Sequence, residues 1–165
     1  MTPTSTLLPP PARTGAATAP QRSLEHALEH ALDADHRLGT GTALLLVEVT
    51  AHPGAPCGTV VERRMRAALR AADRWLALAP GLHAVLLTGL RTAVAEVTAE
   101  RAADALLHSA ERWAPTDPGT GVVVSVGASL APVRAGTAAE AVRQAGAALA
   151  AARSAGGGCA RISAA

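Results

Sequence analysis

The feature that most constrains this chain is the run TALLLVEV at residues 42–49. It is short and almost continuously apolar, without the alternation of polar and apolar side chains that marks a half-exposed strand. Such a run predicts a strand that is buried on both faces. The rest of the chain must then cover both sides of a sheet, and we expect residues 42–49 to be its central strand.

Amphipathic helices are predicted on either side of this strand in the sequence. One covers residues 24–37, with Ser23 as a possible N-cap, and its apolar face consists of Leu24, Leu28 and Leu32. The other covers residues 60–73. Its expected buried stripe comprises Val61, Met65, Leu69 and Ala72.

A hairpin follows the second helix. Residues 74–78 and 82–87 have the composition of strands, and Ala79-Pro80-Gly81 between them has the chemistry of a turn. We therefore expect these two strands to pair antiparallel.

The last part of the chain predicts a helix over residues 93–113, a strand over 121–132, a helix over 139–155 and a short edge strand after a glycine run that ends the last helix. In the helix over 93–113, the positions expected to face the core are Val94, Val97, Ala102, Leu106 and Trp113. The element order is that of a β-α-β-β-α-β core with one helix before it and one after it, an α/β fold.

The amino-acid composition limits the domain organisation and the classes of function that the chain can have. Residues 1–21 are rich in proline, threonine and alanine and predict a disordered tail, which leaves residues 22–165 as a single domain. Cys57 and Cys159 lack the spacing of a zinc site or a disulfide framework, which fits a reducing cytoplasm. No apolar run approaches the roughly 20 residues that a membrane helix needs. We expect a cytoplasmic protein without a metal or another cofactor.

Nucleic acid is an improbable partner. The formal net charge is only +2, and the chain has no phenylalanine or tyrosine on which bases could stack. The arginine-rich face of the helix over 60–73 is interrupted by Glu62 and Asp73. A solvated surface accounts for these arginines.

Several sequence segments, together with the order of the predicted elements, resemble the GGDEF domain of diguanylate cyclases over residues 22–163. The run ALLLVEV stands where the family has the strand that ends in its first metal-binding aspartate. SVGASLAP is similar to the family's Ser-Ile-Gly-Val strand, and AEAVRQAGAALAAARSAGGG to its last long helix and glycine-rich turn. The resemblance implies an α+β sandwich with a central, mainly antiparallel sheet flanked by helices.

The residues that would carry cyclase chemistry differ from the family's. The signature turn aligns with Ala79, Pro80, Gly81, Leu82 and His83, so the acidic signature residues are replaced by Gly81 and Leu82. Glu48 remains as a single acidic position, too few carboxylates for two Mg²⁺ ions. On the last helix, the family's Asp, Tyr and Lys fall on Gly146, Ala150 and Arg153. We therefore expect a degenerate domain with no catalytic residues and no diguanylate cyclase activity.

One element of the family's pattern is retained. Diguanylate cyclases carry an inhibitory Arg-x-x-Asp site upstream of the signature, which binds the product cyclic di-GMP, and Arg70 and Asp73 stand at that offset here. Arginine can bind phosphate or the Hoogsteen edge of guanine with two hydrogen bonds, and aspartate can accept from guanine N–H groups. With the neighbouring Arg74, these residues are the candidate ligand site. The alternative is that the motif is a remnant of the family's pattern or a surface ion pair between Arg70 and Asp73.

Three hypotheses follow. The first is an inactive GGDEF-like regulatory module, in its specific form a cyclic di-GMP receptor through Arg70 and Asp73. The second is an adaptor that binds a protein partner or a second copy of itself and no nucleotide, favoured by apolar replacements such as Leu82. The third is an enzyme with a repurposed pocket that uses Glu48, His83 and Cys57, which requires Glu48 and His83 to lie close together.

Overall fold

The computed structural model describes residues 18–52, 54–55, 58–114, 121–132 and 135–163. The sequence-predicted disordered tail lies outside this part of the chain except for its last four residues, and so does Cys57. The elements, with short 3₁₀ turns written η, are α1 (Ala19–Leu38), β1 (Thr40–Ala51), α2 (Gly58–Ala67), β2 (Arg74–Ala79), β3 (Leu82–Arg91), η1 (Thr92–Val94), α3 (Ala95–Ala110), η2 (Glu111–Trp113), β4 (Val122–Ala131), α4 (Ala138–Ser154) and β5 (Ala160–Ile162).

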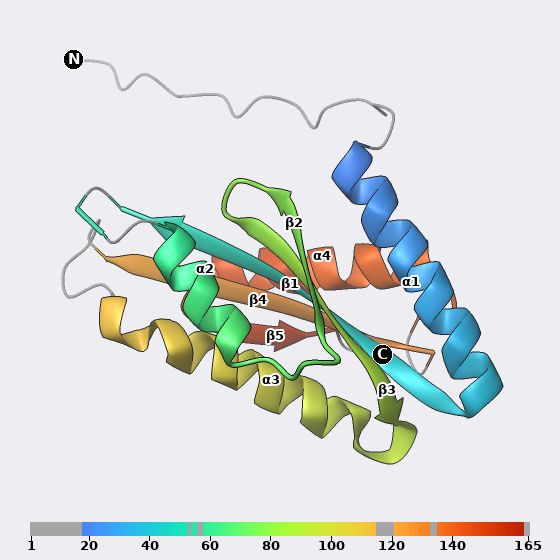
Figure 1. Ribbon diagram of the computed structural model, residues 1–165. Coiled ribbons are helices and arrows are strands. Elements are labelled where there is room, and N and C mark those ends of the chain that lie inside the picture. The colour runs from blue at the N-terminus through green and yellow to red at the C-terminus, as the bar shows by residue number, and fades with distance from the viewer. Residues whose placement is uncertain (1–17, 53, 56–57, 115–120, 133–134, 164–165) are drawn as a thin grey trace.

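The described strands form one sheet in the order β2-β3-β1-β4-β5, antiparallel throughout except for the parallel β4–β5 pair (Figure 1). The predicted central strand is confirmed: β1 lies in the middle of the order, and residues 41–47 are all buried. The predicted hairpin is confirmed as β2 and β3, and the short edge strand as β5. The fold is the mainly antiparallel sandwich that the sequence predicts.

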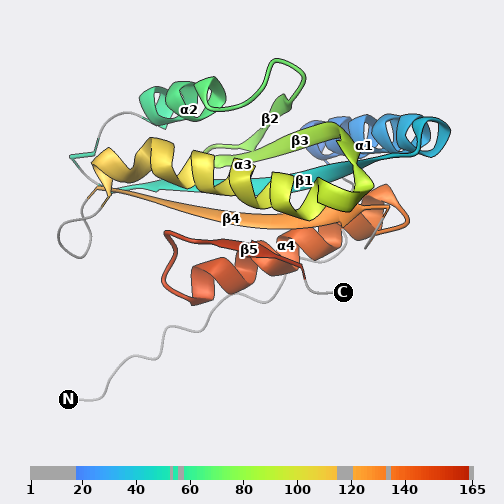
Figure 2. The ribbon, with the colours of Figure 1, turned by 90° about the horizontal axis from the view of Figure 1, so that it is seen from below.

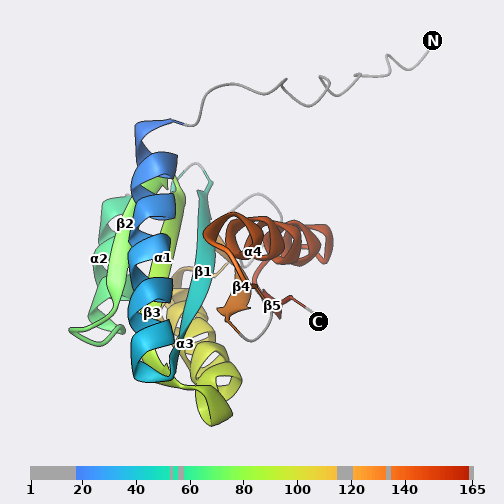
Figure 3. The same ribbon diagram turned by 90° about the vertical axis from the view of Figure 1, so that its right-hand side faces the viewer.

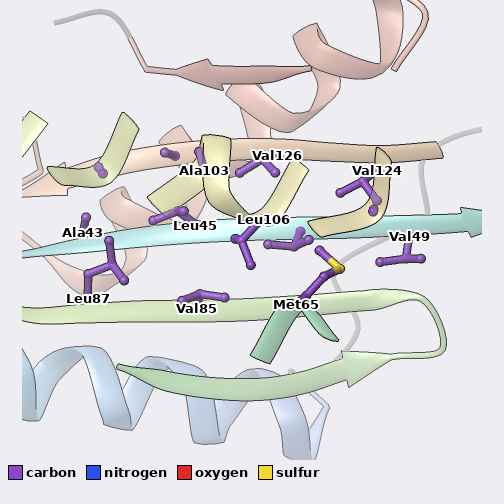
Figure 4. Packing of buried hydrophobic residues seen from close by; sticks show 14 of the residues in the cluster. Ala43, Leu45, Val49, Met65, Val85, Leu87, Ala103, Leu106, Val124 and Val126 are labelled. Atoms are coloured by element: carbon purple, nitrogen blue, oxygen red, sulfur yellow. The ribbon is translucent and has the colours of Figure 1, made fainter. Parts of the chain in front are cut away.

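Helices cover both faces of the sheet (Figure 3). On one face, α2 and α3 pack over the odd-numbered residues of β1, and Met65 and Leu106 are the large side chains they bury there (Figure 4). On the other face, α1 and α4 pack over the even-numbered residues of β1, such as Leu44 and Leu46. The alternation of a β-strand thus separates the two cores. Among the described residues, every helix is too short or too polar to cross a membrane.

The first helix begins earlier than the sequence predicts. It starts at Ala19, inside the segment assigned to the tail, and its N-cap is Thr18 rather than Ser23. Thr18 and Gln21 form a capping box, whereas the Ser23 hydroxyl donates to the carbonyl of Ala19 within the helix. A proline in the first helical turn, Pro20, is compatible with this start because its missing N–H has no intrahelical partner there.

The helix predicted over residues 60–73 ends at Ala67. The amides of Ala68 and Leu69 each donate to the carbonyl three residues earlier, which tightens the last turn and turns the chain toward β2. Leu69 is therefore only partly buried and Ala72 is exposed. The predicted stripe holds for Val61 and Met65, both fully buried.

The buried stripe of α3 confirms the predicted Leu106, which is fully buried, and Ala102 and Trp113 pack partly buried against the core; the prediction is wrong at two positions. Val94 and Val97 are 45% and 46% exposed. The residues that face the core are Ala95, Ala99, Ala103, Leu106 and Ala110. Alanines form most of this face, so α3 approaches the sheet closely. Large apolar side chains in the sequence identify only Leu106 of this face.

Candidate functional site

The hairpin turn of β2 and β3 contains the residues that the sequence resemblance aligns with the GGDEF signature. Ala79 and Leu82 pair across the turn, and Pro80 and Gly81 form it. The carbonyl of Gly81 accepts a hydrogen bond of 2.7 Å from the Val49 amide, which joins the turn to the end of β1. The turn contains no carboxylate. Leu82 is partly buried and packs against the core beneath α1 and α4.

Glu48 lies beside this turn, opposite Leu82 on β3 and Ser125 on β4. Its two carboxylate oxygens accept hydrogen bonds from Nε and Nη2 of Arg153, at the end of α4. The pair is half-buried, with side-chain exposures of 27% for Glu48 and 49% for Arg153. This bidentate contact pairs the carboxylate with a positive charge, which disfavours a cation at the same two oxygens. Among the described residues, no group of three or more metal-ligating side chains could hold a metal ion.

His83 does not meet Glu48. His83 pairs with Val47, whereas Glu48 pairs with Leu82, so adjacent positions place the two side chains on opposite faces of the sheet. Nε2 of His83 instead lies 3.1 Å from Oε1 of Glu62 on α2. The expected pocket around Glu48 and His83 is therefore not formed. Cys57, its third member, lies outside the described residues.

A stack of rings and charges surrounds His83. The Trp75 and His83 rings lie 4.7 Å apart between centroids, and the Arg66 guanidinium lies 5.5 Å from the Trp75 ring centroid. Burial lowers the pKa of His83 from its ordinary value of 6.5, an effect that Arg66 reinforces and the Glu62 carboxylate opposes. Sequence reasoning missed Glu62, Arg66 and Trp75 because the cluster depends on strand register and helix docking.

The lowered pKa of His83 predicts an acid-sensitive fold. The unfolded chain takes up a proton near pH 6.5, before the folded chain does. The free energy of unfolding should therefore be greatest above pH 6.5 and decrease as the pH falls toward the lower pKa of the folded state. Urea unfolding between pH 5 and pH 8 measures this.

The matched variants for this prediction are His83→Phe and His30→Gln. The first keeps a ring against Trp75 but cannot titrate, so its stability should vary less with pH than that of the wild-type chain. The second removes an exposed histidine of α1 and should leave the pH dependence unchanged. Equal pH dependence of the wild-type and His83→Phe chains would contradict the assignment.

The Arg-x-x-Asp motif lies in the turn between α2 and β2. Oδ2 of Asp73 accepts a hydrogen bond of 2.9 Å from the Arg70 amide, and the Asp73 amide donates to the Arg70 carbonyl at 3.0 Å. Nε of Arg70 lies 3.5 Å from the same carboxylate oxygen. The Asp73 side chain is 3% exposed and that of Arg70 is 59% exposed. Asp73 therefore closes the turn, and Arg70 projects from it.

The candidate residues do not form one site. Arg70 and Asp73 precede β2 and the Pro80–Gly81 turn follows it, so the motif and the signature turn lie at opposite ends of that strand (Figure 1). Arg74 is exposed and opposite Leu86, which places its side chain on the α1 face of the sheet. The structure thus separates the Arg70 turn from the Glu48–Arg153 pair.

No protein-family model and no curated protein matches this chain. Solved structures of GGDEF domains do. The GGDEF domain of YfiN (TpbB) from Pseudomonas aeruginosa matches with a TM-score of 0.74 at 23% identity, over 87% of this chain and 89% of that one. The GGDEF domain of DgcB from Caulobacter crescentus, solved in complex with cyclic di-GMP, matches with a TM-score of 0.64 at 16% identity, over 98% of each chain.

A third structure includes a protein partner. The diguanylate cyclase SiaD from Pseudomonas aeruginosa, solved with its activator SiaC, matches with a TM-score of 0.63 at 24% identity, over 86% of this chain and 57% of that one. Together these likenesses establish that the chain has the fold of a GGDEF domain, as the resemblance implies.

Proposed function

We propose that this chain is a non-catalytic regulatory module with the GGDEF fold that binds cyclic di-GMP through Arg70. The observation that carries the proposal is the turn between α2 and β2, where a buried Asp73 carboxylate accepts a hydrogen bond from the Arg70 amide and lies 3.5 Å from Nε of the exposed Arg70 side chain. An arginine held in this way loses less conformational entropy when it binds a phosphate than a freely rotating one.

The non-catalytic part is supported by the surroundings of the signature turn. Phosphoryl transfer from GTP uses Mg²⁺ ions that are held by carboxylates. The turn Ala79–His83 offers none, and the nearby Glu48 is engaged by Arg153. A positive charge beside an already neutralised carboxylate suits neither metal binding nor activation of an attacking hydroxyl.

The ligand part rests on the chemistry of Arg70. Its guanidinium can form two parallel hydrogen bonds with a phosphate or with O6 and N7 of guanine. Asp73 is buried, so we assign it to positioning Arg70 rather than to accepting from the ligand. Arg74 adds a second exposed cation close in sequence. That the DgcB domain was solved with cyclic di-GMP is consistent with this ligand class on the same fold.

Calorimetric titration of the chain with cyclic di-GMP tests the proposal. We expect a saturating signal below about 100 µM ligand and a rise in melting temperature, because the ligand binds the folded chain only. Cyclic di-AMP is the matched control: it keeps both phosphates but lacks the guanine O6 acceptor, so it should bind more weakly. Absence of heat with cyclic di-GMP would contradict the binding. Formation of cyclic di-GMP from GTP and Mg²⁺ would contradict the non-catalytic role.

A further inference from the structure

The outer side of α2 is covered by arginines. Arg63, Arg64 and Arg66 are all exposed, whereas Val61 and Met65 on the opposite side of the helix are fully buried. At about 100° per residue, Arg63 lies farthest from the core, and Arg64 and Arg66 lie on the two flanks of the helix. Guanidinium groups therefore spread across the whole surface that α2 presents to solvent.

The two acids that interrupt these arginines in the sequence do not interrupt them on the surface. Oε1 of Glu62 lies 3.1 Å from Nε2 of His83, and the Glu62 side chain is 25% exposed. The Asp73 side chain is 3% exposed and accepts a hydrogen bond from the Arg70 amide. Both carboxylates are turned toward groups of their own chain. The exposed charge of α2 is therefore mainly positive, and not the mixed charge that the sequence predicts.

A further arginine extends this surface beyond α2. Figure 2 shows α2 beside the C-terminal end of α3, where η2 follows. The Arg64 guanidinium lies 6.0 Å from the centroid of the Trp113 ring of η2, and the exposed Arg112 lies 5.1 Å from it. The partly buried Trp113 ring thus brings guanidinium groups of α2 and η2 together. We refer to Arg63, Arg64, Arg66 and Arg112 as the α2 arginine face.

The arginines of this face are available to a ligand. Among the described residues, none of the four forms an ion pair. The acid next to Arg112, Glu111, instead lies 2.7 Å from Nδ1 of His108. A guanidinium over an aromatic ring interacts through its flat face and keeps the N–H donors at its edge. The ring contacts also restrict the arginine side chains, which reduces the entropy that they lose on binding.

We propose that the α2 arginine face binds an acidic peptide segment of a partner protein. Each guanidinium can donate two parallel hydrogen bonds to one carboxylate, and a cationic surface favours an anionic partner. A single-stranded nucleic acid would need exposed aromatic side chains on which its bases could stack. Trp75 and Trp113 are the two tryptophans of the chain, and both are partly buried with arginines over their rings. The interaction does not depend on the binding of cyclic di-GMP at Arg70.

A fluorescein-labelled peptide, Glu-Asp-Glu-Gly-Glu-Asp-Glu, tests the face by fluorescence anisotropy on the full chain. We expect saturable binding, which is lost when glutamine and asparagine replace the acids of the peptide. The double variant Arg63→Glu/Arg64→Glu should bind at least about tenfold more weakly. The matched control is Arg22→Glu/Arg37→Glu, which makes the same charge change at exposed positions of α1 and should bind as the wild-type chain does. Equal affinities of the two double variants would overturn the proposal.

Tryptophan emission locates the peptide on this face. In a Trp75→Phe chain, Trp113 is the one remaining tryptophan, between Arg64 and Arg112. Its emission should change on saturation with the peptide, because indole fluorescence responds to charges beside the ring. Unchanged emission would overturn the proposal. Tighter binding of a thymidine oligonucleotide of equal charge would also overturn it and would assign the face to nucleic acid.

The Arg70→Ala variant separates this site from the proposed nucleotide site. Arg70 lies beyond the end of α2, in the turn that Asp73 closes. Its replacement should change the affinity for the acidic peptide by less than about twofold. A loss as large as that of Arg63→Glu/Arg64→Glu would mean that the peptide occupies the nucleotide site, and a separate acidic-peptide site would then be wrong.

Discussion

Replacing Gly127 by alanine is expected to lower the free energy of unfolding by about 3 kcal/mol, the largest effect on stability that we predict. Gly127 lies on β4 beneath α4. A Cβ at this position would lie 2.1 Å from the Leu149 amide nitrogen and 2.3 Å from the Ala145 carbonyl oxygen. Both atoms are backbone, so no side-chain rotation relieves the clash, and α4 would have to move away from the sheet.

Gly146→Ala is the matched control for this prediction. Gly146 lies in α4 beside Ala145, and a Cβ there would meet nothing within 4 Å. The substitution should raise the free energy of unfolding by about 0.5–1 kcal/mol, because alanine restricts the unfolded chain more than glycine does. Urea unfolding of both variants measures the two changes in the free energy of unfolding. A Gly127→Ala chain as stable as the wild-type chain would show that α4 does not pack directly on β4.

The parts of the fold that are predictable from the sequence are those whose signal lies within a short stretch of consecutive residues. The strand at residues 42–49 follows from one apolar run, and the hairpin from Ala79-Pro80-Gly81 between two strand-like segments. On α3 the sequence predicts Leu106 correctly but not the other buried positions, because these are alanines, whose burial depends on how closely a helix approaches the sheet. Gly127 illustrates the same limit. The SVGASLAP phrase indicates a strand, but only the docked α4 explains why that strand contains glycine.

The candidate site was predictable to a smaller extent. The offset between Arg70-Ala71-Ala72-Asp73 and the hairpin turn is visible in the sequence, as is the lack of carboxylates in the turn. The contact between Glu48 and Arg153 joins positions 105 residues apart, and no local sequence pattern predicts it. The separation of Glu48 from His83 follows from strand register, in which a shift of one residue exchanges the faces of the sheet.

Arg70→Ala is expected to reduce the affinity for cyclic di-GMP by about 10- to 100-fold, because hydrogen bonds to charged groups contribute about 1.5–3 kcal/mol. Its effect on the free energy of unfolding should stay within about 0.5 kcal/mol, since the side chain is largely exposed. Titration calorimetry and urea unfolding measure the two effects separately. Arg101→Ala, which removes an exposed arginine of α3, should change neither quantity and controls for the loss of one positive charge.

Variants of Asp73 separate a positioning role from direct contact with the ligand. Asp73→Ala removes the acceptor of the Arg70 amide and should lower the free energy of unfolding by about 1 kcal/mol, with a loss of affinity because Arg70 is no longer held. Asp73→Asn keeps a carbonyl acceptor for that amide, so it should retain most of the stability and of the affinity. If Asp73→Asn loses as much affinity as Arg70→Ala while the fold stays intact, the carboxylate contacts the ligand itself and the positioning role is wrong. If Arg70→Ala binds as the wild-type chain does, cyclic di-GMP is held elsewhere, and the turn between α2 and β2 is a structural ion pair.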